Sequence, residues 1–301
     1  MKQIVYLVFI LFSMPVGYSQ CCSPGNPVAG TANVGILNKG KFRAINFYRH
    51  SFSDQYFEKS TKTEYTLLKG AGFDYTGIIF GYGLIEKVTL EVESGYFIQK
   101  YQLYNLDYVY KLNSSGFTSA VFSTKVNVFN NAEKEWELTT AVGVKFPYST
   151  KLKEVNNVIL PQELQPSSGA KGLVTQLFLR KGYSCKKLMF IVLNRTEING
   201  SNPQNYSYGT SSVTTFIVSK AVTKSTSLAM LFRNEVRMKD SKNNFLLPSS
   251  GAIQFFASPM INYRIKTWNF SATLDVPTYQ YMNGRQLGNK YAVSAIIMKD
   301  F

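Results

Sequence analysis

The sequence is poor in the residues on which most enzymes and small secreted scaffolds depend. It has one His, three Cys and two Trp in 301 residues. Three Cys are too few for a disulfide framework, and no HExxH, GxSxG or phosphate-loop motif occurs. The 18 acidic residues are scattered singly, so no pair of carboxylates indicates acid–base chemistry. We therefore expect no enzyme, no resident metal and no cofactor.

Long hydrophobic runs and negative charge are also scarce. After the first few residues no stretch reaches 18 apolar residues, which excludes a membrane-spanning helix. Only 17% of residues are charged, and Lys and Arg outnumber Asp and Glu by 33 to 18. Nucleic acid is the usual partner of a basic protein. The export signal described next argues against nucleic acid and favours anionic lipid headgroups.

The N-terminus has the pattern of a secretory signal peptide. Lys2 is followed by the apolar run Ile4–Phe12, and Gly17 and Ser19 are small residues at −3 and −1 before Gln20. We predict cleavage after residue 19. A lipoprotein acylated at Cys21 is a weaker alternative, because that cleavage prefers a small residue where Gln20 stands.

What the sequence has in abundance is short segments with strand character. In 136–146, for example, Trp136, Leu138 and Val142 alternate with polar or small residues, which is the two-residue period of a β-strand. Aromatics make up 15% of the chain and suit strands and membrane interfaces. We predict twelve strands, at 41–50, 74–83, 87–96, 117–129, 136–146, 173–182, 186–196, 208–219, 225–236, 252–263, 267–276 and 291–301.

The connections between these strands alternate between long and short. The connections 51–73, 97–116, 147–172, 197–207, 237–251 and 277–290 are long, and those between them are six residues or fewer. This alternation is typical of an up-and-down antiparallel transmembrane β-barrel, which has short periplasmic turns and long extracellular loops. An eleven-residue strand tilted by about 45° rises roughly 25 Å, which matches the membrane's apolar band. Twelve strands leave a lumen on the order of 10–15 Å wide. Residues 101–111 are either an extra strand or a protruding extension, and fourteen strands are the alternative count.

The last segment, Tyr291–Phe301, is an apolar strand that ends on an aromatic residue. It resembles the C-terminal signal of Gram-negative outer-membrane barrels. With the Gly/Pro-rich stretch 21–40 and the asymmetry of the loops, the mature chain resembles transporters of the MetA-pathway phenol-degradation family and, more distantly, FadL-like channels. The resemblance implies an outer-membrane location, a porin-like lumen and recognition of Phe301 by the barrel-assembly machinery. It carries over no binding residue.

Charged residues on the expected inner face are the candidate lumen-lining residues. Facing lipid, a Lys or Arg at mid-depth costs about 2–4 kcal/mol, so we expect these side chains to point inward. They either form ion pairs that close the lumen or line a polar conduit. The candidates are Glu91, Glu93, Lys125, Glu137, Lys145, Arg180, Arg233, Glu235 and Asp275. A second basic group at the short turns, including Lys181 and Lys220, is expected to form a periplasmic rim. We expect it to be ordinary solvated turn charge; the alternative is that it attracts phospholipid headgroups or an acidic partner.

Cys and His offer two further hypotheses. A disulfide from Cys185 to Cys21 or Cys22 would tether the N-terminal segment to the periplasmic rim; a soft-metal site at the Cys pair is a weaker alternative. His50 and Ser51 are neighbours in a strand and point to opposite faces, so we expect His50 to be an interfacial residue and not a catalytic base.

We therefore predict three parts: a signal peptide (1–19), an N-terminal periplasmic or plug segment (20–40) and a barrel (41–301). The leading hypothesis is an outer-membrane channel or transporter for small molecules, among which hydrophobic ones are candidates. Membrane lipids are expected as further partners. The alternatives are a structural or adhesive barrel that acts through its extracellular loops, and a secreted soluble β protein.

Overall fold

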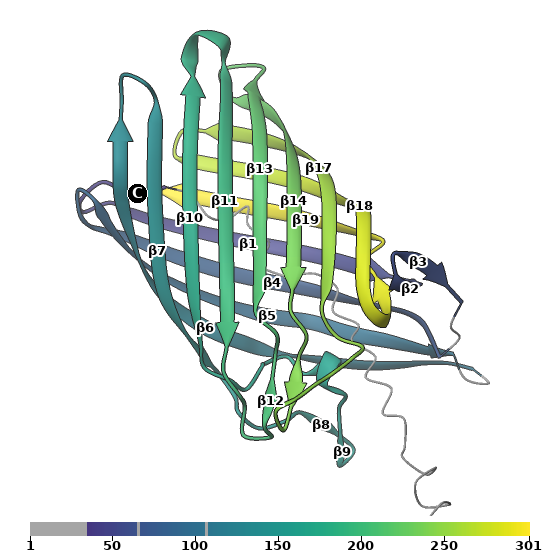
Figure 1. The fold of residues 1–301 in the computed structure, drawn as a ribbon. Helices are drawn as coiled ribbons and strands as arrows, with labels where there is room; N and C mark the ends of the chain where they lie inside the picture. Colours follow the sequence, from purple (N-terminus) through teal and green to yellow (C-terminus); the bar gives the residue numbers. More distant parts are fainter. Residues whose placement is uncertain (1–34, 65–66, 106–107) are drawn as a thin grey trace, which may run out of the picture.

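The chain folds into one closed antiparallel barrel of twelve strands (Figure 1), as predicted. This is a computed structural model, and it describes residues 35–64, 67–105 and 108–301. Each strand pairs with its neighbour along the barrel, and β1 and β19 close the cylinder over the register Arg43↔Asp300 to Phe52↔Tyr291. In barrel order the strands are β1 (Phe42–Ser53), β4 (Leu68–Ile85), β5 (Val88–Asn105), β6 (Val109–Asn131), β7 (Trp136–Pro147), β10 (Gly172–Tyr183), β11 (Leu188–Asn199), β13 (Ser211–Ala221), β14 (Thr226–Arg237), β17 (Ala252–Ile265), β18 (Trp268–Gly288) and β19 (Tyr291–Asp300).

The two ends of the barrel differ as the loop pattern predicted. At one end, here called the short-turn end, the connections are two to four residues long, and one of them contains the 3-10 turn η2 (Ser184–Lys186). The strand ends Phe42 and Asp300 also lie there, because β1 starts and β19 finishes at that end. The opposite end, the long-loop end, carries the remaining connections. Among the described residues no helix is long and apolar enough to cross a membrane.

Three of the predicted long loops are wrong in detail, because strands continue through them. β5 runs to Asn105 and β6 starts at Val109, so residues 97–105 and 109–116 pair in an extension of the barrel wall. β18 continues to Gly288, which leaves a two-residue connection to β19. Residues 51–73 contain the hairpin of β2 (Gln55–Lys59) and β3 (Thr61–Thr63) as well as the start of β4. Above the membrane band a strand can be polar on both faces, so the alternation that located these strands is lost there.

The extended strands form a tall wall on one side of the long-loop end. β4, β5, β6 and β18 have 18, 18, 23 and 21 residues, whereas β7, β10, β11 and β14 have 12 each. The β2–β3 hairpin pairs with β18 above the shorter β19 and β1. Buried Tyr56, Leu68, Ala71 and Leu287 pack this hairpin onto the wall. The wall therefore continues from β18 through β2 and β4 to β6.

Loops cover the other side of the long-loop end, where the strands are short. Residues 148–171 contain the hairpin of β8 (Glu154–Val155) and β9 (Val158–Ile159) and the 3-10 turn η1 (Gln162–Leu164). A small sheet of β12 (Tyr206–Ser207), β15 (Ser241–Lys242) and β16 (Phe245–Leu246) joins the next two loops. Buried Asp240 holds this sheet: it accepts hydrogen bonds from Tyr206 Oη (2.5 Å) and Gly209 N (2.8 Å) and pairs with Arg237 (2.6 Å).

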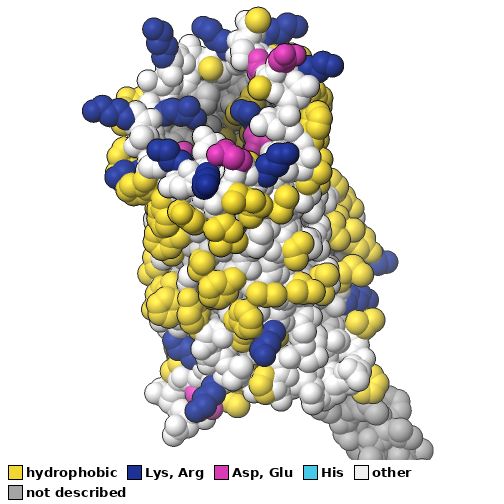
Figure 2. All heavy atoms as spheres, turned by 90° about the vertical axis from the view of Figure 1, so that its left-hand side faces the viewer, with side chains coloured by type: hydrophobic (Ala, Val, Ile, Leu, Met, Phe, Trp, Pro, Cys, Tyr) yellow, Lys and Arg dark blue, Asp and Glu magenta, His cyan; other side chains and the backbone are white. Residues whose placement is uncertain are grey.

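The outer surface of the barrel carries a broad band of exposed apolar side chains. Figure 2 shows this band below an opening surrounded by Lys and Arg at the short-turn end. The residues point outward because they alternate with buried inner-face residues along each strand. A water-soluble protein seldom exposes so large a continuous apolar surface. The band includes Phe80, Leu90, Phe122, Val142, Leu173, Phe216, Phe232, Ile261, Leu274, Val293 and Ile297.

Candidate functional site: the barrel lumen

The structure places all nine candidate lumen residues on inward-facing strand positions. Short ion pairs join several of them directly. Lys125 Nζ lies 2.9 Å from Glu91, and Arg180 Nε lies 3.3 Å from Glu137. The other five candidates belong to two larger networks, each of which spans several strands. The inner face therefore carries charges that are paired with one another.

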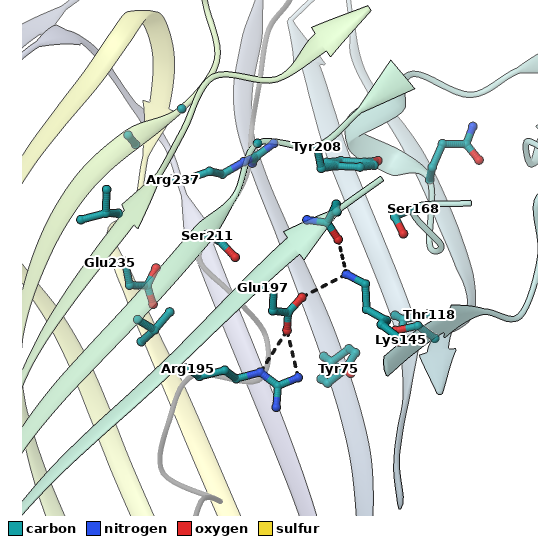
Figure 3. A pocket seen from close by; sticks show the side chains of 18 of the residues that line it. Tyr75, Thr118, Lys145, Ser168, Arg195, Glu197, Tyr208, Ser211, Glu235 and Arg237 are labelled. Carbon is teal, nitrogen blue, oxygen red and sulfur yellow. Dashed lines mark hydrogen bonds and ion pairs between the residues drawn. The ribbon is translucent and has the colours of Figure 1, made fainter. Parts of the chain in front are cut away.

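The first network, called here the Arg195 network, joins β5, β7 and β11. Arg195 donates through Nη1 and Nη2 to both oxygens of Glu93 (2.8 and 3.1 Å) and through Nε to Glu197 (3.0 Å). Lys145 Nζ also contacts Glu197 (3.0 Å) and donates to Asn199. Figure 3 shows Glu197 between Arg195 and Lys145. Because β6, β7 and β10 separate β5 from β11 in the barrel wall, the Glu93–Arg195 pair crosses the lumen.

The second network, the Asp275 network, bridges the opposite part of the wall. Asp275 on β18 contacts Arg49 on β1 (2.6 Å) and Arg233 on β14 (2.8 Å), and it accepts a hydrogen bond from Ser258 (2.6 Å). Arg233 also lies 3.0 Å from Glu235 and stacks 4.2 Å from the ring centre of Phe256. In each network two cations balance two anions, so removing one member leaves a buried charge unpaired.

Three members of these networks were not identified from sequence: Arg49, Arg195 and Glu197. Both faces of 188–193 are apolar, which hid the alternation that places Arg195 and Glu197 inside. Arg49 shares one face of β1 with Phe47 and Ser51, so its inward position was available from the two-residue period.

Apolar side chains cover much of the remaining inner face. The first apolar cluster consists of Ile45, Phe47, Phe73, Tyr75, Ile79, Phe97 and Ile296 on β19, β1, β4 and β5. The second apolar cluster consists of Phe178, Leu193, Ile217, Ala229 and Leu231 on β10, β11, β13 and β14. Aromatic rings lie over glycines within the first cluster: a Cβ on Gly77 would come within 2.2 Å of the Phe47 ring. Water-filled barrels have polar interiors, so these two clusters set this lumen apart.

A cavity of about 230 Å³ lies between the Arg195 network and the loops. Its apolar lining includes Tyr75, Phe97, Val213 and Met282, and Glu235 and the Arg195 network supply charges. Figure 3 shows these charged side chains on neighbouring strands around one space, with Tyr208 at its edge. The cavity is therefore amphipathic.

The loop 148–171 lies over this cavity. Its Gln165 and Pro166 line the space, and Leu164 is buried beside them. Lys100 Nζ donates to the carbonyl of Gln165 (3.2 Å), and Gln162 Nε2 donates to Tyr208 Oη (2.7 Å). Tyr208 faces the cavity, and its hydroxyl donates in turn to the carbonyl of Gln162 (3.2 Å).

At the short-turn end the residues before β1 enter the barrel mouth. Leu37 is only 5% exposed, and its backbone N–H donates to the inward hydroxyl of Thr89 (2.8 Å). Gly40 N–H donates to the carbonyl of Gly83 (2.8 Å). A Cβ on Gly35 would meet the carboxylate of Glu137 on β7 at 2.0 Å. Residues 35–40 therefore cross from the β4–β5 side of the mouth toward β7.

The remaining candidate residues are placed as follows. His50 lies on the outer face, where its Nδ1 is 2.8 Å from Asp74, and Ser51 is buried on the inner face. Cys185 is exposed in the η2 turn and forms no disulfide within the described residues, whereas Cys21 and Cys22 lie outside them. Phe301 follows β19 at the short-turn end and packs on Phe42 (6.0 Å between ring centres). Within the described ranges no group of three His, Cys, Asp or Glu side chains is arranged to hold a metal ion.

Known structures share this architecture. An outer membrane channel from Pseudomonas putida F1 matches with a TM-score of 0.71 and 13% identity, over 90% of this chain and 98% of that one. The fold of this chain is that of an outer-membrane β-barrel. A FadL homologue from Pseudomonas aeruginosa (TM-score 0.45, 7% identity, 87% and 90% coverage) and the toluene transporter TodX from P. putida (0.39, 6%, 88% and 90%) are looser likenesses. No family model and no curated protein sequence matches the chain.

Proposed function

We propose that this protein is an outer-membrane channel for small amphipathic or hydrophobic molecules. Its location is supported by the closed barrel, which leaves no unpaired strand edge, and by the continuous outward band of apolar side chains. Placing the short-turn end in the periplasm follows the usual arrangement of such barrels. The last strand then ends at the periplasmic interface, where Phe301 is the proposed contact for the barrel-assembly machinery.

The observation that carries the proposal is the pair of apolar clusters on the inner face. A channel for polar solutes gains nothing from Phe47, Phe73, Phe97 and Phe178 inside its lumen. A solute that reaches the cavity beneath loop 148–171 meets both charge and apolar surface there. Polar groups in such a cavity orient a ligand while apolar walls supply most of the binding free energy. A small aromatic molecule with one polar group has the matching chemistry.

Residues 20–40 are proposed to regulate passage as a plug. The support comes from the described part of the segment, since Leu37 is buried in the mouth and Gly35 lies against Glu137. The two networks restrict the lumen further toward the long-loop end. Transport therefore requires the segment to shift and the cross-lumen ion pairs to rearrange around the solute.

Uptake into proteoliposomes tests this proposal. We expect the protein to admit benzyl alcohol or phenol derivatives faster than arabinose, and a variant lacking residues 24–38 to be faster for both. Leu193→Gln, which makes the second apolar cluster polar, should reduce the preference for aromatic solutes, while the matched control Leu193→Met retains it. Equal rates for protein-free and protein-containing vesicles, with and without residues 24–38, would sink the channel proposal.

One observation favours a second function, adhesion through the loops. Large apolar side chains are exposed at the loop tips, among them Phe245 at 78% and Val158 at 67%. If binding to surfaces is the function, Phe245→Ser with Val158→Ser should abolish attachment of cells to hydrophobic beads. Solute uptake should be unchanged in that variant.

A further inference from the structure

Lys181 is held over two aromatic rings on the outer face of the barrel. Its ammonium lies 5.3 Å from the ring centre of Trp136 and 4.7 Å from that of Tyr183. Trp136 is the first residue of β7 and pairs in register with Lys181 on β10. The ammonium also donates to the carbonyl of Lys134. The nearby carboxylate of Glu135 accepts the N–H of Ser184 (3.0 Å) and attracts Lys181 electrostatically, without a direct ion pair to it. We call Lys181, Trp136 and Tyr183 the Lys181 clamp.

The same construction recurs on the opposite side of the barrel. Lys299 on β19 lies 4.9 Å from the ring centre of Trp268 and 4.2 Å from that of Phe301. Trp268 is the first residue of β18 and pairs in register with Lys299. Within the described part of the chain, the Lys299 ammonium has no hydrogen-bond or ion-pair partner. We call Lys299, Trp268 and Phe301 the Lys299 clamp.

The two clamps share one pattern: a Lys, an aromatic two residues later on the same face, and a Trp opposite the Lys at the start of the adjacent strand. They use both Trp residues of the sequence. In barrel order β7 and β10 are the fifth and sixth strands, and β18 and β19 the eleventh and twelfth. The clamps therefore lie half a turn apart, and each stands beside a short turn at the short-turn end.

Their surroundings fit an amphiphile with an anionic head. Outward Leu179 and Ile297 lie two residues further along the strands from the two lysines, toward the centre of the apolar band. A lipid whose phosphate contacts the ammonium can therefore lay its acyl chain on these residues. Two ring faces hold each ammonium at the interface. An ammonium has three N–H donors, of which Lys181 gives one to the carbonyl of Lys134.

We propose that the Lys181 and Lys299 clamps are two equivalent binding sites for the phosphate of an anionic phospholipid in the periplasmic leaflet. This inference rests on the proposed membrane location and orientation, and it is independent of solute transport. Each site fixes one headgroup, and the pair fixes the depth of the barrel at two opposite points. Ring and tail contacts distinguish these lysines from the other cations of the same rim.

Native mass spectrometry of the delipidated barrel in a neutral detergent, titrated with phosphatidylglycerol, tests the proposal. We expect two tightly bound lipids per wild-type barrel, one tight and one weakened site in Lys181→Gln or Lys299→Gln, and two weakened sites in the double variant. Loss of one lysine near a lipid phosphate should weaken binding at that site about fivefold. Trp268→Leu should weaken only the Lys299 site.

The matched controls are Lys186→Gln in the η2 turn and Lys220→Gln, whose side chain has no ring contact among the described residues; both should retain two lipids. The neutral lipid digalactosyldiacylglycerol should not bind in this ratio. A wild-type barrel that binds no discrete lipid, or controls that lose lipid as readily as the clamp variants, would overturn the proposal. Heat-modifiable gel migration verifies that each variant is folded. An inactive channel that still binds two lipids refutes only the transport proposal.

Discussion

Replacing Arg195 by Met tests whether the centre of the lumen is dry and closed. The substitution removes the two hydrogen bonds to Glu93 and the one to Glu197. Glu197 keeps Lys145 at 3.0 Å, but Glu93 loses both contacts made by Arg195. Breaking a buried ion pair from one side typically costs about 3–5 kcal/mol, whereas an exposed pair is worth about 0–1 kcal/mol. With Arg195 only 6% exposed, we expect the larger value.

Guanidinium unfolding in detergent micelles, followed by tryptophan fluorescence, measures this cost. The double variant Arg195→Met with Glu93→Gln should recover most of the lost stability, because it removes the charge left unpaired. In planar bilayers Arg195→Met should raise conductance and favour cations, since the crossing side chain is gone and one negative charge is uncompensated. A loss below about 1 kcal/mol with unchanged conductance would refute a dry, bridged lumen.

Four further predictions concern other parts of the molecule. Burial opposes ionisation of Asp240, but Arg237 and the donors around the carboxylate outweigh it and lower its pKa; its stabilisation of the small loop sheet is thus present above about pH 4 and lost as pH falls below that. Hydrogen exchange of the amides in this sheet should show the loss. Asp240→Asn should lower the free energy of opening of the sheet by about 1.5–3 kcal/mol already at neutral pH. Gly77→Ala should displace the Phe47 ring and cost about 1–3 kcal/mol, measured as a lower unfolding midpoint. Deleting Phe301 should reduce the amount of heat-modifiable barrel in membranes, and normal insertion would overturn its role. Cys185 should be blocked to thiol reagents until reduction if it pairs with the N-terminal cysteines, whereas one titratable thiol there without reductant excludes the disulfide.

Within the apolar band the strands were predictable because the membrane imposes a two-residue period. The segments 136–146 and 291–301 correspond to β7 and β19 within two residues at either end. Outside the band that constraint ends. Residues 277–288 and 97–105 continue their strands with polar residues on both faces, so sequence alone indicated loops. The two-residue connection at 289–290 was also not predicted, because the extension of β18 that precedes it was read as a loop.

The sequence predicted which individual charged side chains face the lumen, but it did not predict the networks that they form. Alternation indicates that Glu93 and Asp275 point inward, because a charge facing lipid is costly. It gives no partner across the lumen, since Arg195 lies 102 positions from Glu93 and four strands further round the wall. The apolar clusters were missed for a related reason: in β11 both faces are apolar, and only the closed sheet determines which of them faces the lumen.

The tall wall makes the long-loop end of the barrel higher on one side than on the other. Six residues more per strand, at ~3.3 Å each and tilted by about 45°, raise β4 and β5 about 14 Å above their twelve-residue counterparts. In an outer membrane that height lies among the sugars of the surface lipids. A molecule that diffuses within the sugar layer meets the tall strands on the side of β18 to β6, and it meets the loop 148–171 and the small sheet of β12, β15 and β16 on the side of β7 to β17. The two sides of the long-loop end therefore present different surfaces to the outside: hydrogen-bonded strands on one and loops on the other.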